Sequence, residues 1–448
     1  MKFQSIALAA AIAAAGLSSA MLPVPARAQA AGEQFIPLLV YRTGQFAPLG
    51  IPWADGKQDY LKLVNARDGG VNGVKLAYEE CETAYDAAKG VECYDRLKAK
   101  GTGASGFDPQ STGITFAVTD KAFNDKVSIE TMGYGLSQSV DGTVFEWNFP
   151  LLGTYWDAAD MLVQHVKKKG SLKGKKIALV YHDSPYGKEP IPVLEALAKR
   201  EGFELLKLPV THPGVEQKAT WLQIRQQRPD YVFLWGWGVM NSTAIKEAIA
   251  VSYPRLQMYG VWWAAAEPDV LPAEMAAKGY NGLAMGHSAE NGMPIHKDMM
   301  KFLYDKGKGT AANKSEVGNV LYNRGMLSAM LTVEAIRKAQ EKFGKRVVTG
   351  EEVRWGAENV NLDAARIKAI GVEGLIQPLK TSCQDHGGAH RARIHTWDGE
   401  KWSYTSDMYQ ADMGLLRPMI EASAKKYAEE KKITPVSCGS VTKTASSQ

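Results

Sequence analysis

Four tryptophans stand at the ends of two short apolar runs, in YVFLWGWG from Tyr231 and in VWWAAAE from Val261. A buried tryptophan is usually ringed by apolar neighbours, whereas Trp235 and Trp237 alternate with glycines. Aromatic rings at the end of a strand can stack against the apolar or aromatic body of a small ligand. The pattern therefore predicts a surface lined with tryptophan, and the alternative is that these rings are buried against a helix.

Loops after other apolar runs carry hydroxyls, glycines and backbone amides. These loops are RTGQFAPLG from Arg42, FDPQST from Phe107, MGYG from Met132 and DSPYG from Asp183. Such groups bind small polar or anionic ligands. In an open parallel sheet, ligands lie beyond the carboxyl ends of the strands, so these loops and the tryptophans would meet at one cleft. Any single loop could still be an ordinary turn.

Two motifs suggest other chemistry. CQDHGGAHRARIH places Cys383, His386, His390 and His395 at spacings that could hold zinc, and the alternative is a loop with solvated histidines. GTGASG at 101–106 matches G-x-G-x-x-G, but it follows a charged helical segment instead of a strand, which favours a turn. Neither G-x-S-x-G nor H-E-x-x-H occurs. We therefore expect no enzyme, no metal and no cofactor, although the sequence alone leaves an enzyme open.

The elements that position these loops alternate between short apolar runs and amphipathic segments of helical length. Strands such as FIPLLVY, KIALVYH and YVFLWG are separated by helices of ten or more residues, which predicts parallel sheets covered on both faces. The fold class is a doubly wound α/β protein. Further along, we expect helices at 296–306 and 316–343, a hairpin turning at Asp398 and Gly399, and a tail helix at 415–432.

The first residues have the pattern of a secretory signal peptide. Lys2 precedes a short alanine-rich apolar stretch, and PARAQAAG supplies small residues before a cut near residue 30. Loss of Lys2 and Arg27 would lower the formal net charge from +5 to +3, with the remaining basic residues scattered. We expect an exported periplasmic protein that is monomeric and binds no nucleic acid. At roughly 420 residues, the mature chain should form two lobes.

The cysteines form an even set suited to an oxidising compartment. Four cysteines allow three connectivities. Cys81 lies close to Cys93 in the sequence, and Cys383 and Cys438 form the late pair. We expect these two disulfides, the second of which would join the tail helix to the second lobe.

The order and spacing of LVYRTGQFAPLG, KIALVYHDSPYGKEPIPVLEALAKREGFELL and PDYVFLWGWG resemble the leucine/isoleucine/valine-binding protein family, the type I periplasmic substrate-binding proteins of ABC importers. The resemblance implies two doubly wound lobes joined by three crossing strands near 149–153, 282–288 and 375–379. Lobe 1 would comprise 31–150 and 286–377, and lobe 2 would comprise 151–285 and 378–440, with a frayed tail at 441–448. A ligand would be held between the lobes and delivered to an ABC permease in the inner membrane.

Carried over position by position, the family's ligand contacts fall on loops of both lobes. They are Thr43, Gln45, Phe46, Ser111, Thr112 and Tyr134 in lobe 1, and Tyr186, Trp237 and Trp262 or Trp263 in lobe 2. Amino-acid binders of the family carry an acidic residue where this chain has Trp262 or Trp263. A desolvated ammonium without a counter-charge is strongly disfavoured.

We therefore expect an apolar or aromatic carboxylate as the ligand, with Arg42 helping to hold its polar head. A branched-chain amino acid binder, a sensor without transport and an exported enzyme on the same fold remain alternatives.

Overall fold

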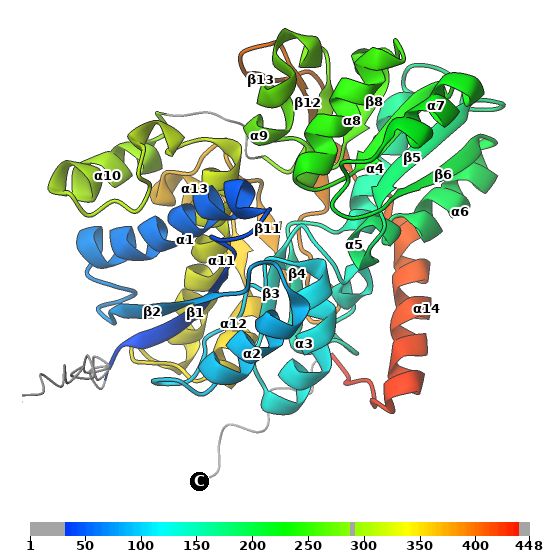
Figure 1. Ribbon diagram of the computed structural model, residues 1–448. Helices are drawn as coiled ribbons and strands as arrows, with labels where there is room; N and C mark the ends of the chain where they lie inside the picture. The colour runs from blue at the N-terminus through cyan, green and yellow to red at the C-terminus, as the bar shows by residue number, and fades with distance from the viewer. Residues whose placement is uncertain (1–31, 287–291, 439–448) are drawn as a thin grey trace, which may run out of the picture.

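A computed structural model describes residues 32–286 and 292–438 (Figure 1). The predicted signal peptide, the frayed tail and residues 287–288 of the second predicted crossing lie outside the described residues. Two groups of elements each surround a sheet, and we call them lobe 1 and lobe 2. In the described part of the chain, no helix is both long and apolar enough to cross a membrane.

Lobe 1 is built on two pairs of parallel strands. Strand β1 (Gln34–Val40) pairs with β2 (Leu76–Glu82), and β3 (Ile129–Met132) pairs with β4 (Asn148–Leu151). The extended segment 105–107 connects the pairs, because Ser105 N–H donates to Phe35 O and Phe107 N–H donates to Ser128 O. The result is one parallel layer in the order β2, β1, 105–107, β3, β4.

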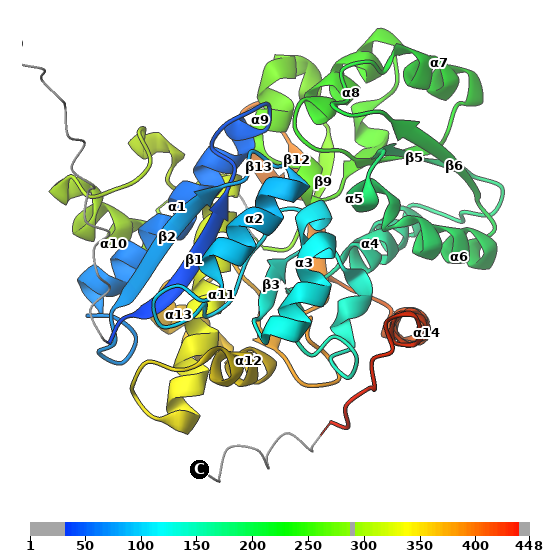
Figure 2. The ribbon, with the colours of Figure 1, turned by 60° about the horizontal axis from the view of Figure 1, so that its bottom comes forward.

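Helices cover both faces of this layer, as a fully buried strand requires. Alternate side chains of β1 enter different cores: Leu38 lies in the core shared with α1 (Ala47–Arg67), and Leu39 in the core shared with α2 (Ala87–Leu97) and α3 (Thr112–Asp125). Figure 2 shows α1 and α2 on opposite faces of β1 and β2. The remaining elements of lobe 1 come later in the chain: α10 (Pro294–Phe302), α11 (Val320–Phe343), α12 (Gly350–Glu358), β10 (Asn361–Leu362), α13 (Ala364–Ile370) and β11 (Leu379–Lys380).

Lobe 2 contains one larger sheet with the strand order β13-β12-β9-β8-β7-β5-β6 and β14 beside β12. Its strands are β5 (Lys176–His182), β6 (Glu204–Val210), β7 (Tyr231–Trp235), β8 (Met258–Gly260), β9 (Asn281–Ala284), β12 (Arg391–Trp397), β13 (Trp402–Tyr404) and β14 (Tyr409–Gln410). The first five run parallel, and β12 with β13 forms the predicted antiparallel hairpin.

The helices of lobe 2 also lie on both faces of its sheet, with α4 and α6 on one face and α7 and α8 on the other (Figure 2). They are α4 (Tyr155–Lys167), α5 (Pro185–Lys188), α6 (Ile191–Glu201), α7 (Lys218–Gln227), α8 (Val239–Ala250) and α9 (Glu267–Val270). The chain passes between the lobes after β4, after β9 and before β12. The predicted fold class, two doubly wound lobes joined by crossing segments, is confirmed.

Both predicted disulfides are present, Cys81–Cys93 and Cys383–Cys438. The expectation that the second joins the tail helix to lobe 2 is wrong. Helix α14 (Met413–Lys431) packs along η1 (Ser137–Val140) and its Lys431 pairs with Asp120 of α3. The tail beyond it hydrogen-bonds to Thr143 through the backbone of Val436. The disulfide therefore fixes the tail beside lobe 1.

The three histidines of the candidate zinc motif are buried, so the expectation of solvated histidines is wrong. His386 contacts the backbone oxygen of Asn148 through Nδ1 at 2.7 Å, and His395 stacks on Trp402 with ring centroids 4.1 Å apart. His390 lies between the carboxylates of Asp157 and Asp385. With Cys383 in a disulfide, the four side chains of the motif do not converge on one point. His386 and His390 instead contact residues more than 200 positions away in sequence, and His395 packs on the neighbouring strand of its own hairpin.

Candidate functional site

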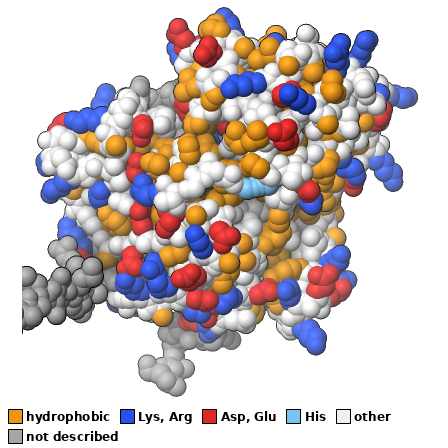
Figure 3. Space-filling model, viewed as in Figure 1, with side chains coloured by type: hydrophobic (Ala, Val, Ile, Leu, Met, Phe, Trp, Pro, Cys, Tyr) orange, Lys and Arg blue, Asp and Glu red, His pale blue; other side chains and the backbone are white. Residues whose placement is uncertain are grey.

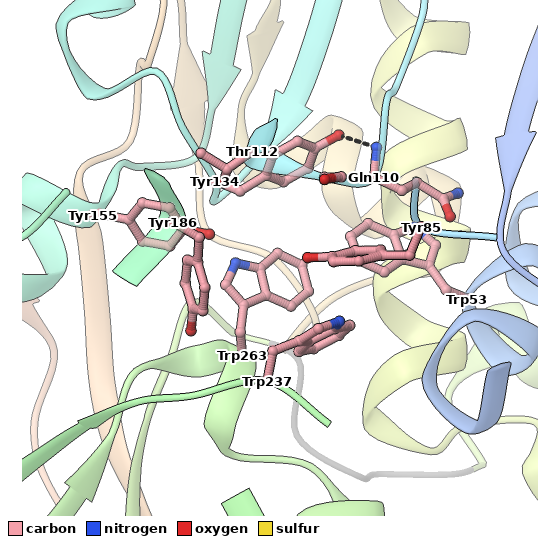
Figure 4. A pocket seen from close by; sticks show the side chains of 10 residues that line it. Trp53, Tyr85, Gln110, Thr112, Tyr134, Tyr155, Tyr186, Trp237 and Trp263 are labelled. Carbon is pink, nitrogen blue, oxygen red and sulfur yellow. Dashed lines mark hydrogen bonds between the residues drawn. The ribbon is translucent and has the colours of Figure 1, made fainter. Parts of the chain in front are cut away.

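A cavity with an empty volume of about 260 Å³ lies between the two lobes, beyond the carboxyl ends of their strands. Most of this space is open to solvent or too narrow for a water molecule, because the region that the centre of a water-sized sphere can reach is only about 20 Å³. Seven of its ten described lining residues are aromatic, and none carries a charge (Figure 4). Lobe 1 contributes Trp53, Tyr85, Gln110, Ser111, Thr112 and Tyr134, and lobe 2 contributes Tyr155, Tyr186, Trp237 and Trp263.

Trp237 enters the cavity from the loop after β7, and the backbone on either side of it requires glycine. A Cβ at Gly236 would lie 2.2 Å from Oδ1 of Asn241, and Gly238 has a φ of 62°, in the left-handed region. The indole of Trp237 lies 6.3 Å from the ring of Tyr85 across the cleft, at an interplanar angle of 28°. The alternation of tryptophan and glycine is therefore the backbone path that brings this ring to the cavity.

Trp262 and Trp263 occupy η3 (Trp262–Ala264), directly after β8, and have different surroundings. Trp263 lines the cavity and stacks on Trp53 of lobe 1, with centroids 4.8 Å apart and planes 10° from parallel. Trp262 is fully buried beside Tyr155, with which it stacks at 6.2 Å. Of the two, Trp263 faces the cavity and Trp262 supports the wall from behind.

A hydroxyl-rich edge of the cavity is formed where α3 begins. Ser111 is the N-cap of this helix, and its hydroxyl accepts from the N–H of Ile114. The first N–H groups of an α-helix have no intrahelical acceptor, and the helix dipole favours an anion at this end. Beside Ser111 and Thr112 lie the phenol groups of Tyr85 and Tyr155, respectively. Burial raises the pKa of both tyrosines, so these rings remain uncharged at neutral pH.

Behind this edge lies a buried ion pair. Lys57 Nζ lies 2.9 Å from Oδ2 of Asp108, and both side chains are almost fully buried. Asp108 also accepts hydrogen bonds from the hydroxyls of Tyr134 and Ser328. The pair thus fixes Tyr134 in the cavity wall while its own charges are satisfied within lobe 1.

A second hollow forms the mouth of the cleft and contains Gln45 and Phe46 together with His212 of lobe 2. Gln45 Nε2 and His212 Nε2 are 2.7 Å apart, and the ring of Phe46 lies 5.5 Å from that of His212. Figure 3 shows hydrophobic side chains at the surface between the lobes, with basic and acidic side chains intermixed over both. The mouth is therefore closed by contacts of Gln45 and Phe46 in lobe 1 with His212 in lobe 2.

Most of the predicted contact residues meet around these two hollows. Ser111, Thr112, Tyr134, Tyr186, Trp237 and Trp263 line the cavity, and Gln45 and Phe46 line the mouth. Thr43 is exposed and lines neither hollow. Arg42 is held instead by Asp55 and Glu80, each at 2.8 Å.

The comparisons with known proteins agree with this architecture. Residues 33–401 match the family model described as periplasmic binding protein. The chain belongs to the periplasmic binding protein family. No curated protein matches it in sequence.

Solved structures of similar fold include ABC transporter proteins from several bacteria. One from the Pseudomonas fluorescens group, described as an ABC transporter permease, has 44% identity and a TM-score of 0.86, and covers 91% of this chain and 100% of that chain. A branched-chain amino acid ABC transporter protein from Thermus thermophilus with bound valine has 21% identity and a TM-score of 0.71, over 85% and 98%. A solute binding protein from R. palustris in complex with 4-hydroxybenzoate has 15% identity and a TM-score of 0.67, over 86% and 100%.

In this periplasmic binding protein, the lobes are closed on each other. The indole N–H groups of Trp262 and Trp263 in lobe 2 both donate to the backbone oxygen of Gly133 in lobe 1, at 2.5 and 2.8 Å. The carboxylate of Glu267 in lobe 2 accepts from the N–H of Val320, the first residue of α11 in lobe 1. Periplasmic binding proteins trap ligand by hinge closure, and these contacts define the closed arrangement.

A buried arginine lies on the far side of the tryptophan wall. The Arg324 guanidinium of α11 lies 4.7 Å from the ring centroid of Trp263, a cation–π contact across the lobes. Burial lowers its pKa to about 10, so it is charged at neutral pH. Burial also raises the pKa of nearby Asp269 to about 7, so part of the compensating negative charge is lost near neutrality. In this periplasmic binding protein, a positively charged guanidinium therefore lies against the indole of Trp263.

Sequence reasoning missed four lining residues: Trp53, Tyr85, Gln110 and Tyr155. Gln110 lies within the selected loop FDPQST, and Tyr85 lies in the loop after β2, so a search of every loop that follows a strand would have found both. Trp53 and Tyr155 lie inside α1 and α4, where the helical pattern does not reveal which residue faces the other lobe.

Proposed function

We propose that this periplasmic binding protein captures a small aromatic carboxylate between its lobes. The observation that carries the proposal is the cavity lined by seven aromatic side chains from both lobes and by no charged side chain. Aromatic faces favour a flat apolar body. The start of α3, with Ser111 as its N-cap, is the place for the carboxylate.

Hydrogen-bonding capacity argues against an α-amino acid. Among the fully buried polar atoms of the lining side chains, those without a partner are Nε1 of Trp53 and Trp237 and both amide atoms of Gln110. Donors therefore outnumber acceptors, whereas an ammonium needs several acceptors or a carboxylate. The nearest acids after η3 are already engaged: Asp269 with Asn241 at 2.8 Å, and Glu267 with the N–H of Val320.

Export to the periplasm and delivery of the ligand to an ABC permease are part of the same proposal. The sequence pattern of residues 1–30, the two disulfides and the family support it. Binding without chemical conversion follows from this role. A ligand recovered unchanged after prolonged incubation is the expected result, and conversion would indicate an enzyme.

A thermal-shift panel tests the ligand class. The mature protein is heated with benzoate, hydroxybenzoates, short aliphatic acids, leucine and valine. A ligand at a hundred times its dissociation constant stabilises the folded state by about 2.7 kcal/mol, which is readily measured. We expect shifts with aromatic acids. A shift with leucine or valine and none with the aromatic acids would overturn the proposal.

A further inference from the structure

The side-chain amide of Gln110 is an unused hydrogen-bonding group inside the cavity wall. Gln110 is 3% exposed and lines the cavity, yet neither Nε2 nor Oε1 has a hydrogen-bond partner. A buried polar group without a partner is costly, so most such groups in folded proteins are paired. Figure 4 shows this amide beside Trp53 and Tyr85, across the cavity from Tyr155 and Tyr186.

The backbone at Gln110 is held in place by its neighbours. Its φ is 55°, in the left-handed region that a residue with a side chain rarely adopts. Its N–H donates to the hydroxyl of Tyr134 at 2.8 Å and lies 3.2 Å from Oδ1 of Asp108, the partner of Lys57. A buried ion pair thus maintains an unfavourable backbone conformation that presents this amide to the cavity.

A carboxylate alone cannot satisfy this amide. A carboxylate has acceptors only, so it can pair with Gln110 Nε2 or with the indole N–H of Trp53 or Trp237 but never with Gln110 Oε1. Oε1 needs a donor, and none of the lining side chains supplies one in the closed structure. A hydroxyl group both donates and accepts, so one hydroxyl can pair with Oε1 and with a neighbouring N–H.

We infer that Gln110 recognises a hydroxyl substituent on the ligand, which makes the preferred ligand a hydroxylated aromatic acid. This inference rests on the proposed function, because it assigns a second polar group to the same ligand. Gln110 is then a specificity-determining residue. A site that hydrogen-bonds a ligand hydroxyl discriminates strongly against the analogue without it, because the site's own polar group is left unpaired.

Calorimetric titration of the mature protein with benzoate, 3-hydroxybenzoate, 4-hydroxybenzoate and the matching methoxybenzoates tests the inference. We expect at least one hydroxybenzoate to bind about tenfold or more tightly than benzoate and than its methoxy analogue, which accepts but does not donate. Gln110→Met removes both amide atoms at similar length and should reduce this ratio to near one. Trp53→Phe is the matched control: it removes one N–H and keeps Oε1, so the preference for hydroxyl should persist.

The comparison of wild-type ratios decides the question even where Gln110→Met does not fold. Equal affinities for benzoate, hydroxybenzoates and methoxybenzoates would overturn the role of Gln110 and leave the proposed function intact. Loss of the preference in Trp53→Phe but not in Gln110→Met would also overturn it. Absence of binding by every aromatic acid would instead refute the proposed function, and this inference with it.

Discussion

Two buried polar groups of this protein, His390 and Gln110, differ in how their hydrogen-bonding atoms are used. His390 lies in the segment that leads from lobe 1 into β12, and its Nδ1 and Nε2 lie 2.8 and 2.9 Å from the carboxylates of Asp157 and Asp385. Gln110 lies in the cavity wall, and neither end of its amide has a partner. The protein itself supplies hydrogen-bonding partners for both ring nitrogens of His390, whereas it supplies none for the amide of Gln110.

The difference separates structural from ligand-binding residues more clearly than residue type does. The sequence suggested the histidines as possible ligands of a metal and did not select Gln110. His390 joins segments more than 200 residues apart in sequence, because Asp157 belongs to α4 and the backbone of His390 pairs with Leu152. We therefore expect the region around His390 to control stability and the region around Gln110 to control binding.

Removal of His390 should have the largest effect on stability. His390→Ala would leave Asp157 buried and Asp385 half-buried without their cationic partner. Loss of one partner from a buried ion pair costs about 3–5 kcal/mol. Urea denaturation followed by circular dichroism should show a decrease of this size in the free energy of unfolding.

His165→Ala is the matched control for that measurement. His165 is half-buried, and its Nδ1 lies 2.9 Å from the hydroxyl of Tyr409 while its ring lies 5.2 Å from that of Tyr259. Burial lowers its pKa to about 4, so it is neutral. Loss of one neutral hydrogen bond costs about 1 kcal/mol. Equal losses in the two variants would show that the carboxylates do not depend on a charged His390.

Stability should also depend on pH through the same group. Burial alone would lower the pKa of His390, but Asp157 and Asp385 raise it to about 10, above an ordinary value near 6.5. Its stabilising effect is therefore complete below pH 6.5 and is lost as the pH rises towards 10, by up to about 1.4 kcal/mol per pH unit. Unfolding curves between pH 6.5 and 10 should show this decrease, and His390→Asn should flatten it.

At low pH, stability should depend on pH in the opposite direction, through the carboxyl group of Asp385. Burial would raise the pKa of Asp385, but His390 and the backbone N–H groups of Gly387 and Gly388 lower it to about 2. The stabilising effect of this carboxylate is present above pH 3.8 and is lost as the pH falls towards 2. A rise in stability on acidification below pH 3.8 would contradict the assignment of this ion pair.

The fold could be predicted from sequence because it depends on local pattern. The alternation of strands and helices is visible over most of the chain, and the closeness of Cys81 to Cys93 in sequence favoured the disulfide pairing that leaves Cys383 with Cys438. The site was predicted only in part, because loops after strands can be recognised but the face that a helix turns to another lobe cannot. Trp53 faces the cavity because α1 packs along α11, a contact between residues some 270 positions apart.

Trp237 should contribute the most to binding among the residues named from sequence. Trp237→Ala should weaken affinity for an aromatic acid by about 1–3 kcal/mol, or about 5- to 150-fold, because a desolvated aromatic anchor is lost. Trp355→Ala is the control, since Trp355 lies in α12 and packs on Phe343 far from the cavity. Titration calorimetry measures both. Similar losses in the two variants would remove Trp237 from the binding surface.

The smallest effect is expected at the mouth of the cleft. Gln45→Ala removes the contact of Gln45 with His212, which joins the lobes at 2.7 Å in the closed structure. A hydrogen bond of this kind contributes about 0.5–1.5 kcal/mol, so the ligand should dissociate about two- to tenfold faster. The association rate should change little, because the bond forms only after the lobes close. Stopped-flow tryptophan fluorescence measures both rates. Thr43→Ala alters an exposed neighbour that lines neither hollow, and an equal acceleration in that variant would exclude a specific role for Gln45 in holding the cleft closed.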